Sequence, residues 1–259
     1  MITTSAGSAA SAAPAAPAAG DPAATAERAS SPHSGFRLGK SLVVAIDGPS
    51  GSGKSSVSRE VARRLRAAYL DTGAMYRAVT LHCIATGVDL QDGVAVEAAA
   101  RGIELFISTS PDRESVTIAG DDVTAAIREP EVSSAVSAVA TTMGARAELI
   151  RRQRALIAGA GHRIVAEGRD ITTVVAPDAE VRILLTASEE ARLRRRGDQL
   201  GGTQTDAQLK QQVIDRDARD STVVNFRQAA DGVVTLDSSD LDFEQTVAAV
   251  LDVVRTIAH

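Results

Sequence analysis

The stretch Leu42-Val-Val-Ala-Ile-Asp-Gly-Pro-Ser-Gly-Ser-Gly-Lys-Ser-Ser56 determines how the rest of the chain is interpreted. An apolar run ends at Ile46, a segment of the form G-x-x-x-x-G-K-[ST] follows, and a helical pattern with Val57, Val61 and Leu65 on one face comes next. Strand, glycine loop and helix in this order predict a P-loop. An ordinary Gly/Ser turn before a helix is the alternative, but both flanking patterns favour the P-loop.

The predicted P-loop offers several groups to a polyphosphate. Glycines let backbone N–H groups crowd around phosphate oxygens, and the helix N-terminus adds the positive end of its dipole. We expect Lys54 to reach the β- and γ-phosphates and the Ser55 hydroxyl to bind Mg²⁺. The expected nucleotide-binding residues of this stretch are Gly48, Pro49, Ser50, Gly51, Ser52, Gly53, Lys54, Ser55 and Ser56.

Composition places the chain among ordinary soluble globular proteins. It has 259 residues, of which 44% are apolar and 24% charged, so one or two domains with an ample core are expected. Aromatic residues make up 2% of the chain and Trp is absent, which leaves few rings for stacking on bases. The net charge of −5 also argues against general nucleic-acid binding.

The single cysteine, Cys83, excludes a disulfide framework and suggests a reducing compartment, so we expect a cytoplasmic location. Its helical neighbours Leu81 and Ile84 favour a core position over a reactive thiol. Residues 1–40 consist mostly of Ala, Ser, Pro, Gly and Thr, a composition that predicts disorder. No signal-peptide pattern or membrane-length apolar run is found, and the scarcity of Arg in 1–40 weakens the alternative of a transit peptide.

Strand and helix patterns alternate along the folded part. Strands are predicted at 42–46, 68–73 (a short strand and a turn), 162–168, 179–186 and 232–237. Helices are predicted at 54–66, 74–86, 94–101, from 131, at 145–158, after Ser188, at 207–220 and at 241–257. This alternation predicts an α/β fold, a parallel sheet with helices on both faces and ligands at the carboxyl ends of its strands.

One segment departs from this alternation. Residues 103–107 and 115–119 have strand patterns separated by a turn, and a second turn at 120–122 follows. Two antiparallel strands inside an α/β chain predict an insertion domain at about 102–130, to which residues 123–127 add a third short strand.

Arginines near predicted strand ends indicate a second anion site. Asp71-Thr-Gly-Ala-Met-Tyr-Arg77 and Gly168-Arg169-Asp170 both follow strands, and Arg146 and Arg216 lie on helices that could cover the same cleft. Guanidinium groups bind phosphates bidentately and neutralise charge during phosphoryl transfer. GTPases need an N-K-x-D motif that the chain lacks, so the D-x-x-G match at 198–201 is interpreted as chance. The pattern favours a small-molecule kinase.

The same motifs resemble those of bacterial cytidylate kinases, in that family's order, over about 42–255. They are Gly48-Pro-Ser-Gly-Ser-Gly-Lys-Ser55, Leu70-Asp-Thr-Gly-Ala-Met-Tyr-Arg77, Arg151-Arg-Gln-Arg154, Glu167-Gly-Arg-Asp170, Val174-Val-Ala-Pro-Asp178 and Arg216-Asp-x-x-Asp-Ser221. The resemblance implies Mg²⁺-dependent transfer of the ATP γ-phosphoryl group to CMP or dCMP. It also implies an insertion domain beside the monophosphate and a helical lid at about 188–206.

The resemblance assigns roles to individual residues. The implied catalytic residues are Lys54, Arg77, Arg169 and Arg216, and the lid residues implied to bind ATP are Arg192, Arg195 and Arg196. The implied CMP phosphate and ribose contacts are Thr72, Arg77, Arg169, Arg216 and Asp220, while Ser137, Arg146 and Asp170 are implied to bind the cytosine edge. A basic solvated helix is the alternative interpretation of the three lid arginines.

Two positions depart from the family pattern. Val223 stands where the family usually has Arg, for which Arg219 or Arg227 could compensate, and Thr172 replaces a common Gly. Two other functions stay open from the sequence. The chain could phosphorylate another small acceptor such as UMP or shikimate, or it could be a non-catalytic P-loop regulator. No sizeable exposed apolar stripe is evident, so a monomer is expected.

Overall fold

The computed structural model describes residues 41–199, 205, 210, 213–214 and 216–258. The predicted disorder of 1–40, the predicted break at Gly201-Gly202 and most of the predicted helix before Arg216 therefore lie outside the described residues.

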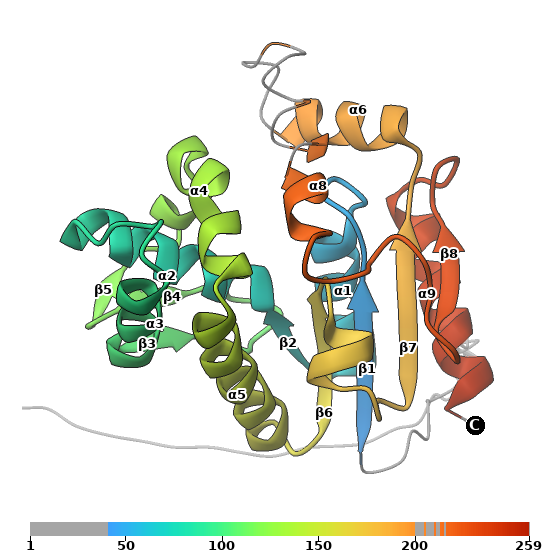
Figure 1. Ribbon diagram of the computed structural model, residues 1–259. Helices are drawn as coiled ribbons and strands as arrows, with labels where there is room; N and C mark the ends of the chain where they lie inside the picture. The colour runs from blue at the N-terminus through green and yellow to red at the C-terminus, as the bar shows by residue number, and fades with distance from the viewer. Residues whose placement is uncertain (1–40, 200–204, 206–209, 211–212, 215, 259) are drawn as a thin grey trace, which may run out of the picture. The chain divides into compact units, whose positions relative to one another are not determined.

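A five-stranded parallel sheet forms the centre of the fold (Figure 1). Its order is β2-β6-β1-β7-β8, and every neighbouring pair is parallel. The strands are β1 (Leu42–Asp47), β2 (Ala68–Asp71), β6 (Arg163–Gly168), β7 (Val181–Thr186) and β8 (Val234–Asp237). The parallel sheet with flanking helices confirms the predicted α/β class.

Helices cover both faces of the sheet, and β1 is apolar on both of its sides. Alternate residues of a strand point to opposite faces. Val43 and Ala45 contribute to one core with α2 (Thr72–Thr86) and α5 (Met143–Gly159). Leu42, Val44 and Ile46 contribute to the other core, which includes residues of α1 (Lys54–Leu65) and α9 (Phe243–Ile257).

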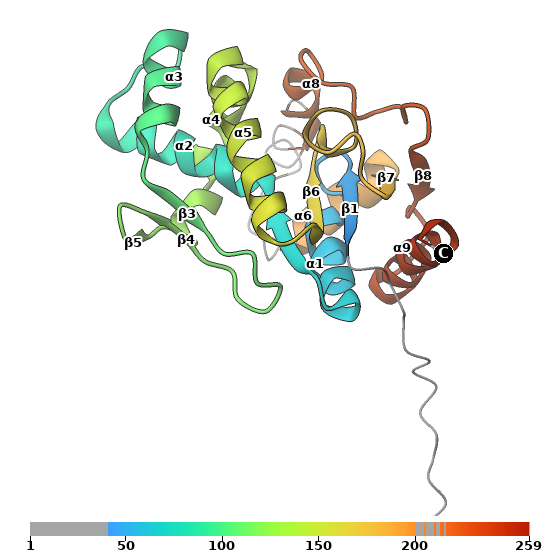
Figure 2. The same cartoon turned by 90° about the horizontal axis from the view of Figure 1, so that it is seen from below.

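A three-stranded antiparallel sheet lies beside α2, away from the β7–β8 side of the main sheet (Figures 1 and 2). It consists of β3 (Leu105–Ile107), β4 (Val116–Ile118) and β5 (Asp121–Asp122). Its first two strands confirm the predicted hairpin. The sheet lies within the predicted 102–130 insertion, whose exact bounds stay a prediction.

The predicted strand at 123–127 is wrong. Ala119 and Gly120 have φ of 51° and 89°, and this tight turn brings Asp121 back against β4 earlier than expected. The segment then forms a short 3₁₀ helix, η1 (Ala126–Arg128), in which Ile127 is fully buried. Ile127, with Val123 packed against the same core, thus anchors a turn.

Helix α2 begins at Thr72, so the turn predicted at Thr72-Gly73 is wrong. The Asp71 side chain accepts a hydrogen bond from the Ala74 backbone N–H at 2.9 Å and so caps the helix directly at the strand end. Gly87, with φ of 70°, ends the helix as predicted. Cys83 is completely buried in this helix, and burial raises the pKa of its thiol.

The remaining described helices are α3 (Gly93–Gly102), α4 (Pro130–Thr141), α6 (Glu189–Gln199) and α8 (Arg216–Asp220), together with a π-helical turn, η2 (Ile171–Val175), that was not predicted. The Ser188 hydroxyl accepts from the Ala191 N–H at 3.2 Å, as expected for a helix cap. Among the described residues, none of the helices combines the length and apolar character that crossing a membrane requires.

Candidate active site

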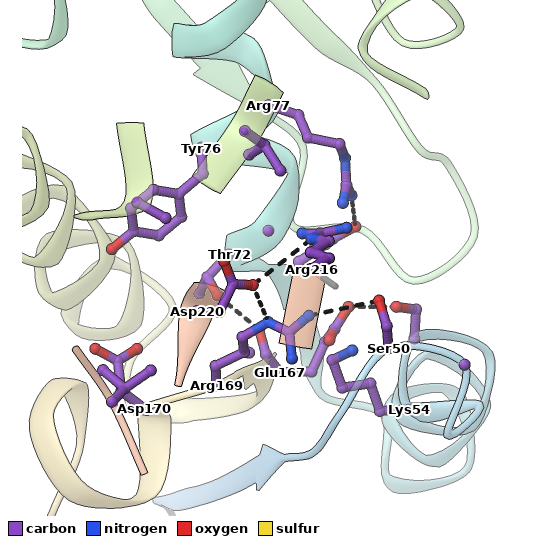
Figure 3. Close-up of a pocket in the computed structure, with 18 of the residues that line it drawn as sticks. Ser50, Lys54, Thr72, Tyr76, Arg77, Glu167, Arg169, Asp170, Arg216 and Asp220 are labelled. Carbon is purple, nitrogen blue, oxygen red and sulfur yellow. Dashed lines mark hydrogen bonds and ion pairs between the residues drawn. The ribbon is translucent and has the colours of Figure 1, made fainter. Parts of the chain in front are cut away.

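The predicted motifs meet in one cavity of about 360 Å³ at the carboxyl ends of β1, β2 and β6. Figure 3 shows the P-loop residues Ser50 and Lys54 at one side of this cavity. Thr72, Tyr76 and Arg77 enter it from α2. Eight basic and four acidic side chains line the cavity, so its walls favour an anionic ligand.

The P-loop has the backbone that its sequence predicts. Gly53 adopts φ of 85°, a left-handed conformation that suits glycine, and α1 begins at the next residue. Lys54 projects from that first turn, and its Nζ donates to the Pro49 carbonyl at 3.4 Å. Burial lowers the pKa of Lys54, while the Glu167 carboxylate favours its charged form.

Two buried carboxylates, those of Glu167 and Asp71, line the cavity together with the P-loop. The Ser55 hydroxyl donates to Glu167 Oε1 at 2.6 Å, and the Tyr69 hydroxyl donates to the same oxygen at 3.3 Å. Burial, together with the neighbouring Asp71 carboxylate, raises the pKa of Glu167 to about 7. Hard oxygen donors therefore stand at the position where Mg²⁺ was predicted at Ser55.

Asp71 is shared by two arginines. Its Oδ2 is 3.2 Å from Arg77 Nη2 and 3.5 Å from Arg128 Nη2. Although burial disfavours the charged carboxylate, Arg77 and Arg128 hold the pKa of Asp71 below its ordinary value. Arg128 also forms an ion pair with Glu114, which in turn pairs with Arg59 at 2.8 Å.

Arg169 occupies the middle of the cavity wall. It forms ion pairs with Asp217 at 2.9 Å and Asp220 at 2.7 Å, and its Nη2 donates to the Ser50 hydroxyl at 3.4 Å. Figure 3 shows Arg169 between Asp220 and Ser50. The ring of Phe226 lies 4.4 Å from the guanidinium carbon. These contacts hold the guanidinium of Arg169 between the P-loop and α8.

Arg216 lies close to Arg169. Its Nε is 3.6 Å from Asp220 Oδ2, and burial, Arg169 and Arg77 lower the pKa of Arg216 to about 9. The Ser137 hydroxyl donates to the other oxygen of Asp220 at 2.7 Å. The guanidinium groups of Arg77 and Arg169 therefore disfavour the charge of Arg216, in a site that a phosphate would neutralise.

Asp170 and Arg146 form a buried ion pair of 2.5 Å. Both side chains line the cavity, as does Tyr76. The pair presents a carboxylate acceptor beside a guanidinium donor, which is the pattern that a nucleobase edge requires.

Asp47, at the end of β1, ties the P-loop strand to the segment that carries Arg169 and Asp170. Its carboxylate accepts from the Ile171 N–H at 2.9 Å, the Thr172 N–H at 2.8 Å and the Thr172 hydroxyl at 2.6 Å. Thr172, the departure from the family glycine, thus makes a buried hydrogen bond of its own.

The arginines of α6 contact the P-loop backbone. Arg192 donates to the Ser50 carbonyl at 3.0 Å and pairs with Asp217, and Arg195 donates to the Ser52 carbonyl at 3.1 Å. Arg195 and Arg196 line the cavity. A freely solvated helix face, the alternative considered from sequence, does not describe Arg192 and Arg195.

Some predicted residues lie behind the cavity wall. Its lining contains Ser50, Gly51, Gly53, Lys54, Ser55, Ser56, Thr72, Arg77, Arg146, Arg169, Asp170, Arg195, Arg196, Arg216 and Asp220, but it lacks Gly48, Pro49, Ser52, Ser137 and Arg192. Val223 and Val224 form part of the wall. Arg219 and Arg227 are exposed and are not part of the lining, so neither takes the place left at Val223.

Four charged residues of the site were not predicted: Asp71, Arg128, Glu167 and Asp217. Asp71 and Glu167 are the last or nearly last residues of β2 and β6, so a carboxylate at a buried strand end was the available signal. Arg128 follows residues that were interpreted as a strand, which concealed its position. Asp217 is a fixed position of the Arg216-Asp-x-x-Asp-Ser221 motif, but the resemblance assigned it no role, and helical periodicity alone does not separate it from a solvated residue.

The chain is similar to known proteins. Residues 44–256 match the family model described as "Cytidylate kinase". Proteins named cytidylate kinase are similar to the chain. That of Cutibacterium acnes is 49% identical, over 82% of this chain and 96% of the relative. That of Rhodococcus opacus is 50% identical, over 83% of this chain and 95% of the relative. That of Streptomyces avermitilis is 44% identical over 83% of this chain and 93% of its own length.

Proposed function

This chain belongs to the cytidylate kinase family, and from that premise we propose which side of its cavity binds each of the two nucleotides. The enzyme transfers a phosphoryl group from ATP to CMP or dCMP. The observation that supports our assignment is the placement of the P-loop and the predicted acceptor residues around one cavity.

We assign the donor nucleotide to the P-loop side. Backbone N–H groups of 50–55 and the Lys54 ammonium group would bind the β- and γ-phosphates. Arg195 and Arg196 extend this side from α6, whereas Arg192 would act indirectly through the Ser50 carbonyl and Asp217.

We assign the acceptor nucleotide to the opposite side. Arg77, Arg169 and Arg216 would bind its phosphate, and Asp220 would bind the ribose. The Asp170 carboxylate would accept from the exocyclic amine of cytosine, a donor that uracil lacks, while Arg146 holds that carboxylate in place. Ser137 orients Asp220 through its 2.7 Å hydrogen bond.

The residues present suit Mg²⁺. Ser55 and Glu167 place a hydroxyl and a carboxylate 2.6 Å apart beside the P-loop, and Mg²⁺ prefers such oxygen donors together with nucleotide phosphates. When bound, Mg²⁺ supplies charge neutralisation at the β- and γ-phosphates. We propose Ser55 as its protein ligand, with Glu167 orienting the hydroxyl.

The proposed reaction needs no nucleophilic side chain. A phosphate oxygen of the acceptor attacks the γ-phosphorus in line while the bond to the β,γ-bridging oxygen breaks, and ADP leaves. The chain's own residues position both nucleotides and neutralise charge, and closure of α6 over the cavity would exclude water. A monomeric state and a cytoplasmic location stay predictions.

The assignment is tested by ADP release measured across CMP, dCMP, UMP, other nucleoside monophosphates and shikimate. We expect CMP and dCMP to give the highest kcat/KM. Preference for UMP or shikimate would contradict the base assignment. ATP binding without acceptor-dependent ADP release would instead indicate a non-catalytic regulator.

A further inference from the structure

Arg128 lies in the cavity wall although it belongs to the small-sheet region and not to the parallel sheet. The 3₁₀ turn η1 directs it there. Ile127, with no exposed surface, anchors this turn in the core, and the Arg128 N–H donates to the Ala125 carbonyl at 2.9 Å. A fixed backbone therefore presents a long, charged side chain to the cavity.

The guanidinium of Arg128 converges with that of Arg77. Both groups approach the same atom, Asp71 Oδ2, at 3.5 and 3.2 Å. Two guanidinium groups around one oxyanion oxygen form the arrangement that recognises a phosphate. Asp71 Oδ2 thus accepts from both arginines in the way that an oxygen of a phosphate bound in the cavity would.

A third guanidinium group lies near Arg77 and Arg128. Arg196 is also near, because Arg77 and Arg128 lower the pKa of its guanidinium in addition to the effect of burial. The Nε of Arg77 is buried without a hydrogen-bond partner among the described residues. Arg128 pairs more closely with Glu114 than with Asp71, while Asp71 is shared with Arg77, whose Nε can still donate to a phosphate oxygen.

We propose that Arg128 is a further binding residue for the phosphate group of the acceptor nucleotide. It acts beside Arg77 and reaches the phosphate from the insertion. The proposal rests on the proposed acceptor site, and it adds a contact that links the small-sheet region to substrate. The competing interpretation is that Arg128 has only a structural role, in which it bridges the carboxylates of Glu114 and Asp71.

The test compares CMP with cytidine, which lacks the phosphate. Binding of both compounds and steady-state kinetics are measured for wild type, Arg128→Gln and Arg128→Lys. Arg113→Gln is the matched control, because Arg113 is an exposed arginine between β3 and β4. Thermal unfolding checks that each variant is folded, and Arg128→Lys keeps the charge if the glutamine variant folds poorly.

We expect Arg128→Gln to raise KM for CMP by about tenfold or more, since charge-assisted hydrogen bonds to phosphate are lost, with KM for ATP unchanged. The affinity ratio of CMP to cytidine should fall by the same factor. Arg128→Lys should lie between wild type and Arg128→Gln, and Arg113→Gln should match wild type.

Equal losses for CMP and cytidine, or no loss for either, would overturn the role of Arg128 as a phosphate ligand. Failure of the underlying acceptor site has a different signature. In that case the wild-type enzyme would show no preference for CMP over cytidine in binding, whatever stands at position 128.

Discussion

Lys54 is the residue with the most direct predicted role. Its ammonium group, at the first turn of α1, donates to the Pro49 carbonyl at 3.4 Å and lies near the carboxylates of Glu167 and Asp217. We expect Lys54→Ala to lower kcat by at least about 10³-fold, because preorganised charge at the transferred group is lost. ADP-release kinetics measure this effect, and thermal unfolding should show a folded variant.

Arg64→Gln is the control for Lys54→Ala, since it removes a positive charge from the more exposed face of the same helix. It should leave kcat unchanged. Near-normal activity of Lys54→Ala would refute the P-loop assignment.

Asp170 should determine the choice of base. Substitution with Ala removes the acceptor for the cytosine amine and leaves Arg146 unpaired in a buried position. We expect the ratio of kcat/KM for CMP to that for UMP to fall by about tenfold or more, because a buried polar mismatch discriminates strongly. If the ratio of kcat/KM for CMP to that for UMP did not change, Asp170 would not contact the base.

Asp47 predicts a pH dependence of stability. Burial raises its pKa from 3.8 to about 6, against hydrogen bonds from Thr172 and Ile171 that lower it. Because the folded pKa exceeds the ordinary value, this carboxyl's stabilising contribution is complete below pH 3.8 and is lost as pH rises through about 6. The shift corresponds to roughly 3 kcal/mol.

Asp47→Asn removes this titration. Between about pH 4 and pH 7, the free energy of unfolding of wild type should fall relative to that of the variant by roughly 2 kcal/mol, as urea unfolding would measure. A constant difference across this range would mean that Asp47 titrates normally in the folded protein.

At the scale of elements, helix α6 supports the P-loop from outside. Arg192 and Arg195 donate to the Ser50 and Ser52 carbonyls, and Arg195 also donates to the Ser238 and Leu241 carbonyls at 2.5 and 3.1 Å. This arrangement joins the helix to the loop after β8. The loop that binds phosphate is therefore braced by side chains that come from more than 140 residues further along the chain.

Arg195→Gln should raise KM for ATP by about three- to tenfold, with KM for CMP changed much less, since each charged hydrogen bond contributes about 1.5–3 kcal/mol and several partners remain. Arg194→Gln, an exposed neighbour on the same helix, is the control. Steady-state kinetics with each substrate varied in turn measure the difference. An equal effect on both KM values would indicate general loss of structure.

The parallel sheet and its helices were predictable because their signals are local. Apolar runs such as Leu42–Ile46, glycine at 53 and 87 and the 3.6-residue period act within a few residues. The turn at Ala119-Gly120 and the cap at Asp71 were misjudged, because a non-glycine residue with positive φ and a carboxylate at a strand end have no distinct local pattern.

The site was predictable where one residue type suits one chemistry. Lys54, Arg77, Arg169 and Asp170 were placed from motifs at strand ends, and they line one cavity. Arg128 and Asp217 could not be placed, because their roles depend on contacts with Asp71 and Arg169 from distant segments. The displacement of Arg192 and Ser137 behind the cavity wall likewise depends on packing that sequence does not contain.

At the scale of the whole described part of the chain, the cavity holds more positive than negative charge. Its eight basic and four acidic lining residues repel one another on balance when no anion is bound. We therefore expect sulfate to raise the melting temperature more than chloride at equal ionic strength. A ligand present at 100 times its dissociation constant stabilises by about 2.7 kcal/mol.

A variant in which both Arg77 and Arg169 are replaced by Gln should lose most of this sulfate effect, as differential scanning calorimetry would measure. Arg101→Gln, an exposed substitution at the end of α3, should retain it. An equal response in all three proteins would place the anion binding elsewhere on the molecule.

The complete burial of Cys83, the one cysteine of the sequence, has a practical consequence. Because the thiol is inaccessible and its pKa is raised by burial, it should not react with maleimide dyes in the folded enzyme. Dye attachment points could then be introduced at the exposed positions Arg113 and Arg194 without removing the native cysteine. Fluorescence energy transfer between these labels would report directly on opening and closing of the cleft during turnover.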